Sequence, residues 1–297
     1  MNKESLKKIV YTLGKMLGII ALLFVFYKLS QEYTLESFSD KFSSILSLLP
    51  FLIILNVVSI ILGIYAWHIM LRNYAHKVFS FIDSYYYFAK TEIAKYLPGN
   101  VFHFIGRQAF ASKLGITQVQ MAKTSVLFSF LLLVATIISS TFFVLFTKKL
   151  PDYIIWVMLL ATAITLVTII LTYKSFPLNK KIQINILLIL SVALQGIMLA
   201  TIILYQQTSF NNELFLQCTS IYIISWLIGF ITPGASGGLG IREGTFITII
   251  SFLHINISSE IIIFSVLLVR LINIFIDILL FLSTFLLESK INKIHSS

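Results

Sequence analysis

Charged residues are scarce in this 297-residue sequence: Asp, Glu, Lys and Arg make up 11% of it, against roughly 25% in an average soluble domain. Hydrophobic residues account for 58% of the chain, and the mean hydropathy is +0.94. This balance excludes a water-soluble globular protein. Because the apolar residues form long runs, we predict an all-α polytopic membrane protein whose residues 1–297 form a single integral-membrane domain.

Cysteine is almost absent, since Cys218 is the only one, which excludes an internal disulfide. The histidines have no metal-ligand spacing, and they are His68, His76, His103, His254 and His295. We therefore expect no metal and no cofactor. The formal net charge of +10 comes from basic residues scattered between apolar runs, which favours topology determinants over a nucleic-acid surface.

The long apolar runs predict about six full membrane spans. The first, Ile9–Leu29, follows basic residues as a signal peptide does, but it is long and lacks a small-residue cleavage site. We expect it to be a retained span. The other predicted full spans are Leu46–Leu71, Thr124–Phe146, Ile154–Tyr173, Ile182–Tyr205 and Glu260–Leu287.

Charge in the connections predicts which side each connection occupies. The connection before the second span carries three acidic residues, which are Glu32, Glu36 and Asp40. Basic connections include Arg72, His76 and Lys77, then Lys174, Lys180 and Lys181, and finally Lys290 and Lys293. By the positive-inside rule, both termini are cytoplasmic. Lys148 and Lys149 fall on the outside and count against the rule.

Two segments, Asp83–Lys113 and Glu213–His254, are too polar or too broken to be simple spans. We interpret each as a pair of short helices that meet at a break and form a re-entrant hairpin. Two full crossings would satisfy the charge pattern equally well, but the 14-residue stretch Ile241–His254 favours a hairpin within half the membrane. The residues that break the helices are Pro98, Gly99, Asn100, Pro233, Gly234, Gly237, Gly238 and Gly240.

The second break, ITPGASGGLGIREG over residues 231–244, is where we expect function. A charge at the bilayer centre costs about 2.5 to 3.5 kcal/mol, so Arg242 and Glu243 need a protein interior or a polar cavity. The glycines let the backbone approach a ligand, and a helix beginning near Leu239 would direct free amides and its positive dipole end into the gap. A lipid phosphate is the anion available there. The structural alternative is that both residues pair with other buried charges.

Further charged residues lie on the last long helix and around the first break. Arg270, Asn273 and Asp277 follow an i, i+3, i+7 spacing and share one face. We expect Arg270 to pair with Glu243, and Asp277 to pair with Arg242 or Arg107. Such a polar core could bind substrate, or it could be purely structural. The candidate substrate-binding residues are Arg242, Glu243, Arg270, Asp277, Arg107, Glu92, Lys95 and Asn273. We assign no role to His103 and expect no catalytic residue.

Both breaks share an outline, LPGNVFHFIGR over residues 97–107 and TPGASGGLGIR over residues 232–242. This is either a weak inverted repeat or a coincidence, because Pro-Gly commonly ends helices. The two segments resemble the marker regions of the lysylphosphatidylglycerol synthase transmembrane family, which includes the flippase portion of the bacterial multiple peptide resistance factor. The matching residues are Lys95, Tyr96, Pro98, Gly99, Gly106, Arg107, Pro233, Gly234, Gly237, Gly238, Gly240, Arg242, Glu243 and Gly244.

The resemblance implies a multi-pass protein of the bacterial cytoplasmic membrane that moves an anionic or aminoacylated phospholipid between leaflets. The best-understood members also carry a soluble synthase domain, whereas this chain ends at Ser297 soon after its last span, so we expect no synthase activity. The lipid could instead be a polyprenyl-linked or glycosylated one. The sequence leaves open whether the protein forms a homo-oligomer.

Two other functions compete with translocation. The protein could be a non-transporting membrane partner of a lipid-modifying enzyme or glycosyltransferase. It could also be an intramembrane serine protease, because Gly234–Gly238 matches G-x-S-x-G around Ser236. The only nearby base, His254, would then lie 18 residues away, or about 27 Å along a helix at 1.5 Å per residue. We favour translocation.

Substitution of Ser236 separates these chemistries. A protease loses all activity in the Ser236→Ala variant, because the nucleophile is gone. A translocase that uses Ser236 only to accommodate the backbone keeps its activity. We expect lipid exchange by reconstituted Ser236→Ala protein to match the wild type, and loss of a measured proteolytic activity would contradict that expectation.

Overall fold

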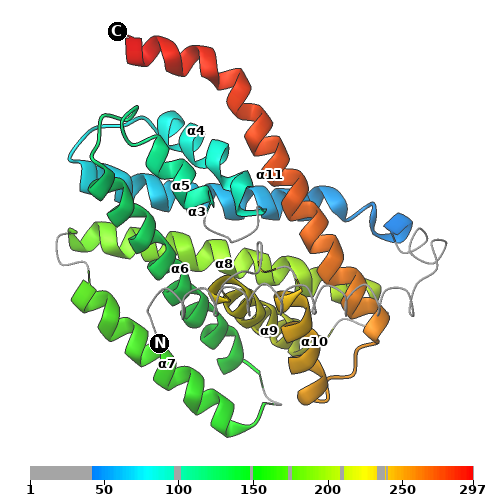
Figure 1. The fold of residues 1–297 in the computed structure, drawn as a ribbon. Helices are drawn as coiled ribbons and strands as arrows, with labels where there is room; N and C mark the ends of the chain where they lie inside the picture. The colour runs from blue at the N-terminus through cyan, green and yellow to red at the C-terminus, as the bar shows by residue number, and fades with distance from the viewer. Residues whose placement is uncertain are drawn as a thin grey trace, which may run out of the picture.

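The computed structural model describes residues 42–96, 102–147, 150–172, 176–207, 211–232, 238 and 240–296. Every regular element within these residues is helical, which confirms the all-α class (Figure 1). Six described helices are long and apolar enough to cross a membrane. They are α3 (Leu49–Ala75), α6 (Gln118–Leu145), α7 (Asp152–Thr172), α8 (Leu178–Gln206), α9 (Asn212–Ile231) and α11 (Ser259–Ser296). The chain is therefore a multi-pass membrane protein.

Five of the predicted full spans correspond to α3, α6, α7, α8 and α11. The first predicted span, Ile9–Leu29, lies outside the described residues. The other long helix is α9, which begins the second interrupted segment and has 20 residues. The prediction of a short helix here was wrong. The Ser, Thr, Gln and Cys residues within Asn212–Ile231 make the stretch more polar, but they do not interrupt the helix. Re-entrant or crossing topology stays a prediction.

The first interrupted segment does consist of short helices. It contains α4 (Phe81–Glu92), the 3₁₀ turn η1 (Ile93–Tyr96) and α5 (Phe102–Ala109). The second segment ends in α10 (Ile241–Phe252), which has 12 residues. These four elements are too short to cross a hydrocarbon core of about 30 Å.

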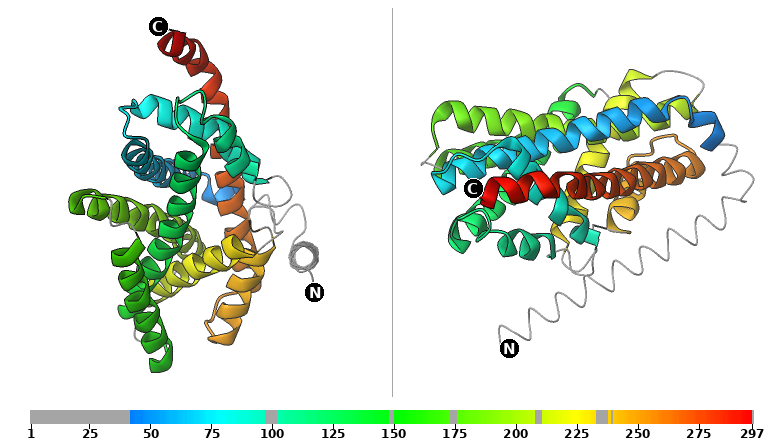
Figure 2. Two further views of the ribbon diagram at one scale, coloured as in Figure 1. Left: turned by 60° about the vertical axis from the view of Figure 1, so that its left-hand side comes forward. Right: turned by 90° about the horizontal axis from the view of Figure 1, so that it is seen from above.

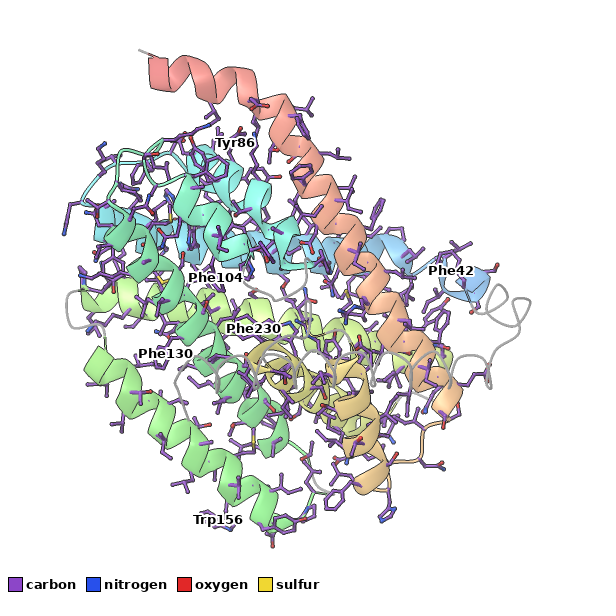
Figure 3. The ribbon with its side chains drawn as sticks, in the orientation of Figure 1. Phe42, Tyr86, Phe104, Phe130, Trp156 and Phe230 are labelled. Carbon is purple, nitrogen blue, oxygen red and sulfur yellow. The ribbon has the colours of Figure 1, made fainter. Side chains whose placement is uncertain are left out.

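Two long helices, α3 and α8, lie side by side through the middle of the bundle (Figures 1 and 2). Helix α6 packs across both and also contacts α9. Helix α11 crosses α3 and α8 (Figure 1) and contacts α4 and α10, so it joins the two interrupted segments. Helix α7 packs mainly on α6, and its Trp156 points away from the bundle (Figure 3). Each short helix thus packs against one or two long ones.

Local sequence fixes where several helices begin. At α4, the Ser80 hydroxyl accepts a hydrogen bond from the Asp83 amide, and the Asp83 carboxylate accepts one from the Ser80 amide, both at 3.1 Å. Thr117 and Gln120 form the same reciprocal box at the start of α6. Such boxes satisfy amide groups that a helix terminus leaves unpaired. They set the register in which α4 and α6 present their residues to the interior.

Small and hydroxyl residues let the long helices pack closely. The Ser59 hydroxyl on α3 donates to the Ser191 carbonyl on α8 at 2.8 Å. The Ser140 and Ser220 hydroxyls lie 2.8 Å apart between α6 and α9. Between α8 and α9, a Cβ atom built on Gly196 would lie 2.8 Å from the Thr219 carbonyl oxygen. Close contact of this kind drives helix association in membranes, where apolar area alone does not.

Gly196→Ala should therefore separate α8 from α9. We expect a loss of about 1 to 3 kcal/mol of stability, which is the usual cost of overpacking. A matched control is Gly63→Ala, because a Cβ there would meet the Ser191 hydroxyl at an ordinary 3.7 Å. Thermal unfolding in detergent measures both variants, and equal midpoints would refute the tight contact at Gly196.

Candidate functional site

A cavity of about 190 Å³ lies among the two interrupted segments and the long helices. All eight candidate substrate-binding residues line it, and they are Glu92, Lys95, Arg107, Arg242, Glu243, Arg270, Asn273 and Asp277. The structure thus brings together residues from α4, η1, α5, α10 and α11. Among the predicted break residues, Gly238 and Gly240 are described, whereas Pro98, Gly99, Asn100, Pro233, Gly234 and Gly237 lie outside the described residues.

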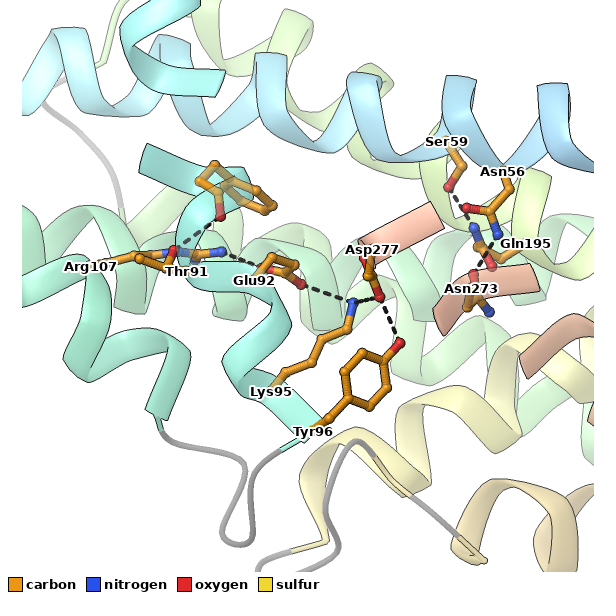
Figure 4. A network of polar contacts seen from close by, with 11 residues as sticks. Asn56, Ser59, Thr91, Glu92, Lys95, Tyr96, Arg107, Gln195, Asn273 and Asp277 are labelled. Carbon is orange, nitrogen blue, oxygen red and sulfur yellow. Dashed lines mark hydrogen bonds and ion pairs between the residues drawn. The ribbon is translucent and has the colours of Figure 1, made fainter. Parts of the chain in front are cut away.

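A chain of ion pairs crosses the cavity from α5 to α11 (Figure 4). Arg107 contacts the Glu92 carboxylate at 2.7 Å, and Lys95 contacts the same carboxylate at 3.2 Å. Lys95 also lies 2.8 Å from the Asp277 carboxylate, to which the Tyr96 hydroxyl donates at 2.6 Å. Positive and negative side chains therefore alternate along this chain, so most of its charge is neutralised within the protein.

Arg107 is the most enclosed cation of this chain, with a side chain only 2% exposed. Besides Glu92, its guanidinium carbon lies 4.1 Å from the Phe88 ring centre and 5.6 Å from that of Trp67. Aromatic faces attract cations, more strongly where water is excluded. Carboxylate and rings together fix Arg107, so its evident role is to hold α5 against α4.

A second ion pair joins Arg270 on α11 to Glu243 on α10, as the sequence predicted. The predicted partner of Asp277 was wrong, because Asp277 pairs with Lys95 rather than with Arg242 or Arg107. Arg107 is already held by Glu92. The turn η1 carries Lys95 towards α11, which places an ammonium group closer to Asp277 than either guanidinium.

Arg242 stands apart from the other cations. Within the described part of the chain, no carboxylate lies within 4 Å of it, and its buried Nε has no hydrogen-bond partner. Its nearest favourable contact is the Trp226 ring, 5.2 Å from the guanidinium carbon. The described cavity lining holds four Lys or Arg residues and three carboxylates, so one positive charge is left without compensation there.

Two glycines make room for the Arg242 side chain. A Cβ on Gly229 would overlap the Arg242 Cγ, and one on Gly238 would lie 2.7 Å from the Arg242 Nε. Gly238 also has φ of +70°, a conformation that favours glycine. Gly238 thus lies against the Arg242 side chain, and the predicted approach of a ligand to its backbone stays a prediction. Gly240, at φ +79°, caps the start of α10.

Part of the cavity lining is polar but neutral. The Asn56 amide donates to Asn273 at 2.5 Å, and the Gln195 amide donates to the Ser59 hydroxyl at 3.0 Å (Figure 4). Asn273, Gln195 and Ser59 line the cavity. Amides and hydroxyls can exchange hydrogen bonds with hydroxyl groups of a ligand. The cavity therefore combines charged groups with neutral hydrogen-bonding groups.

Sequence reasoning did not select several residues that line the cavity, among them Tyr96, His103 and Trp226. Tyr96 is part of the family-like marker around Lys95, so that signal could have found it. His103 is 6% exposed, and its Nδ1 is buried without a hydrogen-bond partner. Trp226 is one aromatic residue among many on an apolar helix, and no sequence signal distinguishes it.

The described residues give no support to a serine-protease site. Ser236 lies outside them. His254 follows the end of α10, is exposed, and is absent from the described cavity lining. Arg242 lies in the first turn of α10, at the other end of this helix from His254.

No protein-family model matches this sequence, and no curated protein matches it either. What the cavity can do chemically follows from its geometry. Removing a charge from water costs several kcal/mol unless an opposite charge compensates it. A cavity with one uncompensated guanidinium therefore favours an anionic ligand, and a phosphate suits a guanidinium because it can accept two parallel hydrogen bonds.

Glu92 is the carboxylate on which two cations depend, because both Arg107 and Lys95 contact it. Glu92→Gln should lower stability by about 3 to 5 kcal/mol, the typical cost of breaking a buried pair. Glu288→Gln is the matched control, since the Glu288 side chain paired with Lys90 is 43% exposed and should matter little. Unfolding midpoints in detergent compare the two variants, and an unchanged midpoint for Glu92→Gln would contradict the shared role.

Proposed function

We propose that this protein is a lipid translocase that binds the phosphate-bearing head group of a membrane lipid in the cavity around Arg242. The observation that carries this proposal is the uncompensated Arg242 guanidinium in a cavity that is otherwise charge-balanced. Membrane lipids are the phosphate compounds available to a multi-pass membrane protein. The substrate class comprises anionic or aminoacylated phospholipids and polyprenyl-linked phosphate lipids.

Two features of α10 support phosphate binding at Arg242. The residue belongs to the first turn of α10, where unpaired amides and the positive end of the helix dipole favour an anion. Gly229 and Gly238 fit closely around its side chain, which limits the positions that the guanidinium can take. A guanidinium that is already positioned loses less entropy when it binds a phosphate.

The remainder of the head group has its own partners. The Glu243 Oε2 is buried without a hydrogen-bond partner, so it can accept a hydrogen bond from an amine or hydroxyl of the head group. The neutral side chains of Gln195 and Asn273 offer further hydrogen-bond partners. A volume of about 190 Å³ suits a head group rather than a whole lipid, because pockets for drug-sized ligands span roughly 300–1,000 Å³. The acyl chains would remain in the bilayer.

Several finer features belong to this proposal. We place the protein in the bacterial cytoplasmic membrane with both termini in the cytoplasm, and we treat each interrupted segment as a re-entrant hairpin at the translocation path. Broken helices at mid-depth are where transporters bind polar substrates. Movement runs downhill or is coupled to a proton through a buried carboxylate. A partnership with a lipid-modifying enzyme remains the alternative.

Leaflet exchange in reconstituted vesicles tests the proposal. The lipids are head-group-labelled phosphatidylglycerol and an aminoacylated counterpart, and the proteins are wild type, Arg242→Gln and Glu243→Gln. We expect Arg242→Gln to slow exchange of both lipids at least about tenfold, the loss that corresponds to one charge-assisted contact of about 1.4 kcal/mol. Glu243→Gln should slow the aminoacylated lipid more.

Lys123→Gln is the control, because Lys123 is an exposed α6 residue absent from the described cavity lining. It should exchange lipid as the wild type does. Normal exchange by folded Arg242→Gln protein would overturn the proposed site. No exchange of any lipid by folded wild-type protein would favour the partner function.

A further inference from the structure

A second pocket lies at the end of α3 and the beginning of α8, with a volume of about 360 Å³. We call it the α3–α8 basic pocket. Its lining residues are Tyr65, His68, Ile69, Arg72, Asn73, His76, Lys77, Val78 and Lys180. None of them lines the cavity around Arg242.

The charge of this pocket is one-sided. Arg72, Lys77 and Lys180 contribute three cations, and no carboxylate is among the described lining residues. In the cavity around Arg242, by contrast, three carboxylates face four cations. The nearby Asp83 is 5% exposed, does not line the pocket, and accepts hydrogen bonds from the Ser80 amide and hydroxyl. The pocket therefore concentrates positive potential.

The printed contacts of two of these cations are to uncharged groups. The Lys77 ammonium donates to the Gly115 carbonyl at 3.2 Å, and the Lys180 ammonium donates to the Gln183 side-chain oxygen at 3.3 Å. The Arg72 side chain, in the last turn of α3, is exposed. All three side chains can thus turn towards an anion.

Helix stability does not explain Lys180. It lies in the first turn of α8, where no acidic residue is present. A cation there faces the positive end of the helix dipole, which is unfavourable. The positive-inside rule accounts for basic residues in both connections. It does not require residues 72–77 and Lys180, far apart in sequence, to converge on one pocket.

The pocket also carries an apolar edge. Val78 lines it and is 86% exposed. Basic residues beside an exposed apolar side chain are suited to the membrane surface, where the head group is anionic and the acyl region begins just below. A soluble phosphate would contact the cations but gain nothing from Val78.

We propose that the α3–α8 basic pocket is a second anion-binding site, which holds the phosphate group of an anionic membrane lipid at the bundle surface. The bound phosphate contacts Arg72 and Lys180, and the lipid backbone rests against Val78. This site does not depend on translocation through the cavity around Arg242.

A fluorescent reporter at the pocket edge tests the proposal. Val78→Cys carries a bimane group, and the native Cys218 is 0% exposed and stays unlabelled. The labelled protein in detergent is titrated with dioctanoyl phosphatidylglycerol, dioctanoyl phosphatidylcholine or inorganic phosphate. We expect a saturable signal with phosphatidylglycerol at concentrations where phosphatidylcholine has little effect. A signal with inorganic phosphate at the same concentrations would assign the site to a soluble anion instead of a lipid.

Charge variants in the labelled protein identify the residues responsible. Arg72→Gln with Lys180→Gln should raise the half-saturating concentration of phosphatidylglycerol about 30-fold, since each basic residue near a membrane surface is worth about 1 kcal/mol. Lys123→Gln and Arg242→Gln should leave it unchanged. Equal responses to both lipids, or a double variant that behaves as Lys123→Gln does, would overturn the site. Because exchange depends on Arg242 and this signal does not, either proposal can fail alone.

Discussion

Charges inside an apolar bundle must be compensated, and this requirement organises the short helices of the protein. Helices α4 and α10 bury apolar side chains such as Phe88 and Phe246, and ion pairs also tie the short helices α4, α5 and α10 to their neighbours. Glu92 joins α4 to α5, Lys95 joins η1 to Asp277 on α11, and Arg270 joins α11 to α10. Because a buried charge without its partner is costly, these pairs specify one arrangement of the segments.

Against this background of compensation, the surplus at Arg242 is informative. Arg107 shows how the fold compensates a buried cation: a carboxylate and aromatic rings enclose it. Arg242 has an aromatic neighbour and two close glycines but no described carboxylate. The protein holds the Arg242 side chain in position, and no described carboxylate forms an ion pair with it. That combination is expected of a residue whose counter-ion arrives from outside.

Much of the fold and of the cavity lining could be predicted from the sequence, because apolar runs predict long helices and charges within them must face the interior. The pairing could not be predicted. Asp277 has several cations within reach, and only the path of η1 decides that Lys95 is its partner. The roles of Gly229 and Gly238 depend on where Arg242 crosses them. The α3–α8 basic pocket likewise requires distant connections to meet.

The position of α7 has a consequence for how the protein can vary. This helix packs mainly on α6, and none of its residues is among the described lining of either pocket. Its exposed face is apolar and faces outward at Trp156. Sequence drift on that face is constrained only by hydrophobicity. An epitope or a fluorescent protein inserted at either end of α7 would therefore allow the protein to be detected without altering the residues that line either pocket.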